Sequence, residues 1–163
     1  MLAWIVIAAA AVQVVSIERS PILTFSAHPE RARVTTQVDV GLLRSRSGVK
    51  HYWFRRTVKP DNSHVVETRW ADTRSCPAGR VALEELTTLE APRPYVYGLD
   101  GRYDLMLIAD GVTYRMETDT APPFHNGKMK LQSNVGTPLA RWVEATTTKL
   151  SGCWAKTAPK EET

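Results

Sequence analysis

The sequence predicts an α+β fold, a mostly antiparallel sheet of about six or seven strands with one short internal helix and a C-terminal helix packed on it. Several segments alternate apolar and polar residues with the period of a strand, and two others carry apolar residues at helical spacing. The connections between the strand-like segments are short, which favours antiparallel neighbours. With 163 residues, of which 43% are apolar, the chain is long enough to bury one core.

The N-terminal segment is typical of an export signal. Residues 1–15 are apolar except for Gln13, and a helix of that length spans about 22 Å, short of the roughly 30 Å of a bilayer core. We expect residues 1–16 to be a cleaved signal peptide, although no Lys or Arg precedes the apolar run; an uncleaved N-terminal anchor is the alternative. In both cases the folded part is periplasmic or secreted, and only an uncleaved segment would touch the membrane.

The boundaries of the folded domain follow from the patterns on either side of it. Residues 17–30 contain Pro21 and Pro29 without a clear period, so they are predicted to be a linker or an irregular lead-in. The single α+β domain is expected to cover residues 31–155. Residues 156–163 are polar and are expected to form a loose tail.

Three strands and a helix are predicted in the first half of the domain. Residues 31–43 alternate in polarity, and residues 49–58 and 64–71 form a hairpin in which Pro60 suits the second position of the turn. A turn near Asp61 places His51 opposite a residue near Trp70. The helix follows at residues 79–90, with an apolar stripe made of Ala82, Leu83, Leu86 and Leu89 or Glu90.

The second half begins with a strand at residues 95–99 and a hairpin at residues 103–117, which is predicted to lie at the centre of the sheet. Its turn is Asp110-Gly111, and its run 105–108 is apolar on both faces. A last strand is expected at residues 128–134. The C-terminal helix is expected to be capped by Thr137 and to end at Gly152 in the left-handed conformation. Its predicted buried stripe is Leu139, Trp142, Val143, Thr146 and Leu150.

The two cysteines, Cys76 and Cys153, are predicted to form one disulfide, because an even number of thiols in an exported protein is most simply paired. The bond would join the start of the first helix to the end of the second, and closing so long a loop contributes roughly 4 kcal/mol in the chain-entropy model. The alternative is a catalytic Cys76 thiolate at a helix N-terminus. Its base would then be His51, His64 or His125.

The charge of the chain is unevenly distributed between its two halves. Residues 29–80 hold nine Arg and two Lys against five acidic residues, whereas residues 81–163 have a net charge of −2. The first half can therefore present a basic face to an anionic surface, glycan or acidic protein, and Arg55 and Arg69 are the candidate contacts. The loop tip Phe124-His125-Asn126, held by two prolines, is the other candidate binding element. The simpler alternative to a binding surface is that these arginines only lie on the solvent-exposed face of a sheet.

Other kinds of site find little support. The histidines and cysteines lack metal-ligand spacing, no cofactor motif occurs, and nucleic-acid-binding motifs are missing from the sequence. Four carboxylates near the predicted central hairpin could act as acid and base: Asp104, Asp110, Glu117 and Asp119. They are explained more simply as turn residues and as solvent-facing strand ends. The aromatic residues on the predicted strands are interpreted as part of the hydrophobic core rather than as the lining of a ligand groove.

These observations favour an exported, non-enzymatic binding or interaction protein of the cell envelope. One alternative is a small periplasmic hydrolase that uses dispersed carboxylates or Cys76. A further alternative is a structural envelope component without a ligand. The observations behind the favoured assignment are an export-like N-terminus, one predicted disulfide and a predicted sheet rich in aromatic residues, with no catalytic signature.

Overall fold

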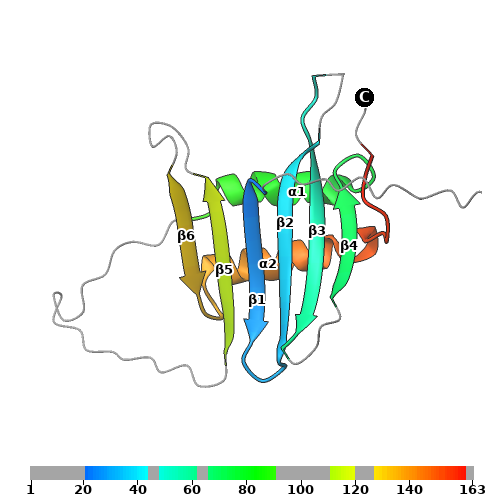
Figure 1. Cartoon of the computed structure of the whole chain (residues 1–163). Helices are drawn as coiled ribbons and strands as arrows, with labels where there is room; N and C mark the ends of the chain where they lie inside the picture. The colour runs from blue at the N-terminus through cyan, green and yellow to red at the C-terminus, as the bar shows by residue number, and fades with distance from the viewer. Residues whose placement is uncertain (1–20, 44–47, 62–65, 91–110, 120–126, 161–163) are drawn as a thin grey trace, which may run out of the picture.

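The computed structural model of the protein describes residues 21–43, 48–61, 66–90, 111–119 and 127–160. They form a six-stranded antiparallel sheet of order β4-β3-β2-β1-β5-β6 with two helices on one face (Figure 1). The predicted α+β class is confirmed. The elements in chain order are β1 (Leu23–Pro29), β2 (Val34–Leu43), β3 (His51–Pro60), β4 (Glu67–Asp72), α1 (Pro77–Thr87), β5 (Val112–Asp119), β6 (Lys128–Ser133), α2 (Pro138–Lys149) and the 3₁₀ turn η1 (Ser151–Cys153).

Strand β1 corrects the prediction of a linker at residues 17–30. Residues 23–29 form a strand in the interior of the sheet, between β2 and β5. Leu23 and Phe25 are buried beneath the helices, and the intervening Thr24 lies on the opposite face. The prolines obscured this alternation, because Pro21 precedes the strand and Pro29 is its last residue, where a missing N–H disturbs the ladder least.

Strands β2, β3 and β4 confirm the strand at residues 31–43 and the hairpin that follows it. The register differs from the predicted one. Arg55, rather than His51, lies opposite Trp70, and Trp53 lies opposite Asp72. The reason is that β3 extends to Pro60 and β4 begins only at Glu67, so the midpoint between the two strands lies C-terminal to Asp61. His64 lies outside the described residues.

The strand pairing predicted for the central hairpin, residues 103–117, is wrong. Its second arm is β5, but along residues 114–118 one edge of β5 pairs with β1 and the other with β6. A strand has only two edges, so the partner expected from the Asp110-Gly111 turn has no place there. The first arm at residues 103–109 and the strand at 95–99 lie outside the described residues. Strand β6 confirms the strand predicted at 128–134.

Both predicted helices are present, with small changes at their ends. Helix α1 starts at Pro77, two residues earlier than expected, and ends at Thr87. Helix α2 is capped as predicted, since the Thr137 side chain accepts a hydrogen bond from the Ala140 N–H at 3.1 Å. The prediction that α2 ends at Gly152 in the left-handed conformation is wrong. The chain instead continues into η1, in which the Cys153 N–H bonds to the Leu150 carbonyl at 3.0 Å.

Trp142 of α2 is the side chain that joins the three parts of the core. Its ring meets Phe25 of β1 edge to face, with the ring centroids 4.9 Å apart. Its indole N–H donates to the carbonyl of Ala82 in α1 at 2.9 Å. Aromatic pairs of this kind contribute about 0.5–1.5 kcal/mol beyond burial. One residue therefore sets both the distance of α2 from the sheet and its alignment with α1.

We predict that Gly41→Ala destabilises the fold by about 1–3 kcal/mol, the usual range for overpacking. Trp53 on the neighbouring strand lies across Gly41, and an added Cβ would sit 2.2 Å from its ring atom Cζ2. Denaturant unfolding followed by fluorescence measures the change. Gly152→Ala is the matched control, because its Cβ would meet nothing within 4 Å, and it should change stability by less than about 0.5 kcal/mol. Equal effects of the two substitutions would contradict the packing of Trp53 on Gly41.

Candidate functional site

The two arginines predicted to contact a ligand lie on opposite faces of the sheet. Side chains alternate along a strand, and Phe54 and Ala71 form an opposed pair that is buried under the helices. Arg69 lies two residues from Ala71 and therefore shares the helix-covered side. Arg55 is one residue from Phe54 and lies on the other face. Arg55 and Arg69 cannot form one site.

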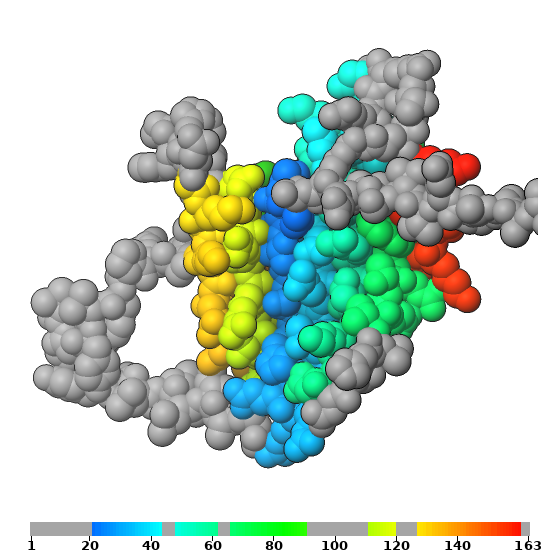
Figure 2. Space-filling view, viewed as in Figure 1, coloured from blue at the N-terminus to red at the C-terminus, as the bar shows by residue number. Residues whose placement is uncertain are grey.

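On the face without helices (Figure 2), Arg55 is part of a closed network around Asp39. Asp39 is only 3% exposed, and its Oδ2 accepts from Arg55 Nε at 3.1 Å and Nη2 at 2.8 Å. Its Oδ1 accepts from Thr24 Oγ1 at 3.0 Å and from Gln37 Nε2 at 2.8 Å. The guanidinium also lies over the Trp70 ring, 5.7 Å from its centroid. The charge of Arg55 is thus balanced by a buried carboxylate, and the network joins four strands.

The carboxylates of β5 on this face are also paired. Glu117 lies 3.0 Å from the Lys130 ammonium and 3.7 Å from that of Lys128, which in turn lies 3.5 Å from Asp119. The hydrogen bond from Lys130 is the main cause that lowers the pKa of Glu117. These cross-strand pairs are exposed, so solvent screening leaves each with little effect on stability. Asp104 and Asp110 lie outside the described residues.

A different arrangement occurs on the helix side of the β3–β4 pair, where Arg56 and Arg69 lie directly opposite each other. One carboxylate serves both: Glu67 Oε1 is 2.7 Å from Arg69 Nε and 3.9 Å from Arg56 Nη2. The hydrogen bond from Arg69, followed by the charges of both arginines, lowers the pKa of Glu67. Like charges in an opposed pair repel. Two cations with one anion leave a net positive charge here.

The chain after α2 forms one side of this cluster. The Arg56 guanidinium lies over the Trp154 ring, 5.1 Å from its centroid. Ala155 and Trp70 exchange backbone hydrogen bonds of 2.8 and 2.7 Å. The residue that follows this bridge, Lys156, is exposed. We call Arg56, Arg69, Glu67, Trp154 and Lys156 the β4-edge cluster.

One hydrogen bond reaches the segment predicted to be a loose tail, residues 156–163. Arg74 Nη2 donates to the carbonyl of Lys160 at 2.8 Å, and Figure 1 shows this red segment beside β4. Residues 161–163 lie outside the described part. The loose tail stays a prediction, and the backbone bridge to Trp70 lies at Ala155, the last residue of the predicted domain.

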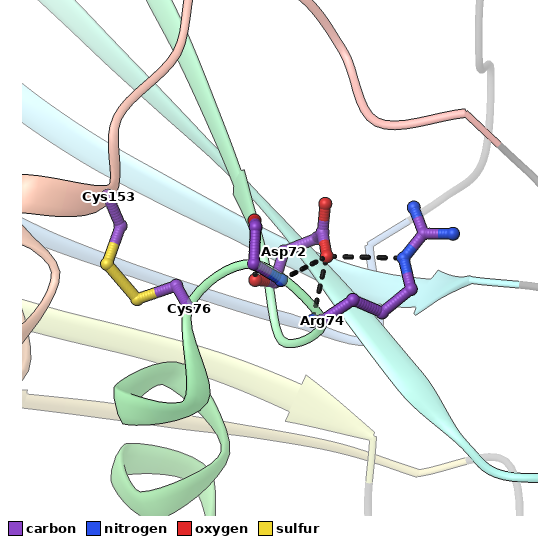
Figure 3. The surroundings of a disulfide bond; sticks show 5 residues. Asp72, Arg74, Cys76 and Cys153 are labelled. Atoms are coloured by element: carbon purple, nitrogen blue, oxygen red, sulfur yellow. Dashed lines mark hydrogen bonds and ion pairs between the residues drawn. A yellow bond between two sulfur atoms is a disulfide. The ribbon is translucent and has the colours of Figure 1, made fainter.

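The Cys76–Cys153 disulfide is confirmed, with the two Cα atoms 5.8 Å apart. It joins the residue before α1 to the last residue of η1, next to the turn that leaves β4 (Figure 3). In that turn, Asp72 Oδ1 accepts from the backbone N–H groups of Arg74 at 2.8 Å and Ser75 at 3.2 Å. A bonded Cys76 carries no thiolate, so the proposal of a catalytic Cys76 is wrong for this oxidised state.

Two cationic or aromatic members of the cluster, Arg56 and Trp154, were missed by sequence reasoning. Arg56 is in phase with the buried Phe54, and an arginine on the core-facing side of a strand was the available signal. The buried Nε of Arg56 and Nε1 of Trp154 have no hydrogen-bond partner in the described part of the structure. The predicted binding loop of Phe124, His125 and Asn126 lies outside that part, as do His64 and the export-like residues 1–16.

Comparison of the chain with protein-family models, curated proteins and solved structures found no match. Within the described ranges no three His, Cys, Asp or Glu side chains are grouped so that they could hold a metal ion. None of the helices in those ranges is long and apolar enough to span a membrane. The case for a function therefore depends on the geometry of the cluster.

We predict that Asp72→Asn weakens the acid dependence of stability. Burial disfavours the ionised Asp72, but the N–H groups of Arg74 and Ser75 and the Arg74 guanidinium outweigh it, so the pKa lies below its ordinary 3.8. A lowered pKa adds stability above the unfolded-state pKa of about 4, and this stability is lost as pH falls through the folded-state pKa. The variant should be about 1 kcal/mol less stable at pH 7.

Urea unfolding between pH 7 and pH 2.5 measures this difference, which should shrink towards the acid end. Asp119→Asn is the matched control, because Asp119 is an exposed member of an ion pair, and its effect should stay within about 0.5 kcal/mol at every pH. A constant difference between wild type and Asp72→Asn across the range would contradict a lowered pKa at Asp72.

Proposed function

We propose that the protein is an exported, non-enzymatic binding protein of the cell envelope that takes an anionic ligand at the β4-edge cluster. The observation that carries the proposal is the opposed pair of Arg56 and Arg69 with a single carboxylate, Glu67, between them. The side chains of the two arginines are 26% and 29% exposed, so a ligand can reach them. Lys156 adds a third cation at the same edge.

The contrast with Arg55 supports this choice of site. Arg55 gives two hydrogen bonds to a buried carboxylate, which it shares with no other arginine of the described residues. Arg56 and Arg69 share one exposed carboxylate, and within the described residues their remaining guanidinium N–H groups have no other carboxylate partner. A guanidinium presents a planar fork that matches a carboxylate or a phosphate with two parallel hydrogen bonds. A second guanidinium opposite the first lets both forks bind the same anionic group.

Export is supported by the apolar run at residues 1–15 and is compatible with the Cys76–Cys153 disulfide, since disulfides persist in oxidising compartments. The hydrolase alternative loses one of its two routes, because Cys76 is bonded. Its other route relies on dispersed carboxylates, and those on β5 are engaged with lysines. A structural component without a ligand would have the same fold, and a binding measurement separates it from a binding protein.

The test is a titration of the oxidised protein with three anionic probes: inorganic phosphate, a sulfated oligosaccharide, and vesicles containing phosphatidylglycerol. Calorimetry serves for the first two probes and co-sedimentation for the vesicles. Arg69→Gln and Arg56→Gln should each weaken binding of the recognised probe about tenfold, which corresponds to about 1.4 kcal/mol. The effect should decline as salt is added.

Arg115→Gln is the matched control. It removes the same charge from β5, where Arg115 is exposed and donates to the Gln132 amide at 3.1 Å. This variant should change affinity less than about twofold if only screened long-range attraction is lost. An equal loss with Arg115→Gln would indicate diffuse attraction to a basic protein instead of a site. Failure of all three probes to bind the oxidised wild type would contradict the proposed anionic ligand.

A further inference from the structure

We infer that the Cys76–Cys153 disulfide controls the β4-edge cluster, so that its reduction releases residues 154–160 from β4 and abolishes anion binding while the sheet stays folded. This inference rests on the proposed function for its binding readout. Its structural part, the release of the segment, stands on the contacts alone.

The cluster depends on a segment that directly follows Cys153. Trp154 packs on the Arg56 guanidinium, and Ala155 bridges Trp70. The two residues directly after the cysteine therefore hold the segment against the cluster. The covalent bond fixes the start of this segment beside the N-terminus of α1, at the β4 edge (Figure 3).

In the described part of the structure, the other interactions that hold the segment are the packing of Trp154 against the core and Arg56, the two backbone hydrogen bonds between Trp70 and Ala155, and the bond from Arg74 to the Lys160 carbonyl. A protein hydrogen bond contributes a net 0.5–1.5 kcal/mol or so, and ordering one residue of backbone costs about 1–2 kcal/mol. Without its covalent anchor, a seven-residue segment with these contacts is at best marginally ordered.

The core has separate anchors that precede Cys153 in the chain. Leu150 and Thr146 are fully buried, and Trp142 joins α2 to both β1 and α1. Lys149 also pairs with Glu85 of α1. The five strand pairings of the sheet do not involve the segment. Reduction should therefore free residues 154–160 before it affects the sheet.

The chemistry is thiol–disulfide exchange with a dithiol reductant. Cys153 is half-buried, whereas Cys76 is 2% exposed, so the attacking thiolate reaches the Cys153 sulfur. The sulfur–sulfur bond breaks, a mixed disulfide forms at Cys153, and Cys76 leaves as a thiolate that takes up a proton. The second thiol of the reductant then attacks the mixed disulfide and frees Cys153 as a thiol. Two electrons pass to the protein, and the reductant becomes a cyclic disulfide.

The first experiment measures amide hydrogen exchange by NMR before and after reduction with dithiothreitol. The amides of Trp70 and Ala155, which form the bridge, should exchange at least tenfold faster in the reduced protein, whereas the amides of β1 should keep their protection. Unchanged exchange at Trp70 and Ala155 would overturn the inference. Equal acceleration in β1 would also overturn it, because the disulfide would then hold the whole fold and not the cluster.

The second experiment measures binding of the anionic probe that the wild type recognises. The double variant Cys76→Ser/Cys153→Ser and the variant Trp154→Ala, which keeps the disulfide, should each bind at least tenfold more weakly. Wild-type affinity in either variant would overturn the control of binding by this segment. If no probe binds the oxidised wild type, the proposed function fails, and hydrogen exchange still decides whether the disulfide holds the segment.

Discussion

The bond between Cys76 and Cys153 is the constraint on which the arrangement of the β4 edge depends. It joins the start of α1 to the end of η1, so both helices must meet the sheet at the same edge. The chain that follows then has one short route, along β4. That route gives β4 a backbone partner at Ala155 and brings Trp154 onto Arg56. A single covalent link thus protects a sheet edge and completes a basic cluster.

Charge balance separates the two groups of arginines on β3 and β4. Arg55 faces a buried Asp39 whose two oxygens are saturated by four donors, which makes it part of the scaffold. Arg56 and Arg69, which form the next pair along the β3–β4 ladder after Arg55 and Trp70, share one exposed Glu67. The alternation of the strand puts these groups on opposite faces. The same residue type therefore stabilises the sheet on one face and is available to a ligand on the other.

Features set by local sequence were predictable, and features set by pairing were not. The cap at Thr137 and the period of β2 follow from short patterns, and the disulfide follows from the presence of two cysteines in a chain with an export-like N-terminus. The edges of β5 are taken by β1 and β6, a non-local choice that the Asp110-Gly111 turn signal does not contain. Arg69 was a predicted contact, but its partner Arg56 depends on the register of the β3–β4 hairpin, in which Trp70 pairs with Arg55, four residues from the predicted His51. The loop of Phe124, His125 and Asn126 lies outside the described residues and stays a prediction.

The proposal to be tested is that, within its described part, the protein binds anions at the β4-edge cluster and not on the face of the sheet without helices. The most direct measurement follows the arginine Nε–Hε NMR signals of the oxidised protein while the recognised anionic probe is added at constant ionic strength. We expect saturable shifts at Arg56 and Arg69, with the signals of Arg55 and Arg115 unmoved. Shifts at Arg55, or equal unsaturable shifts at all four arginines, would contradict it.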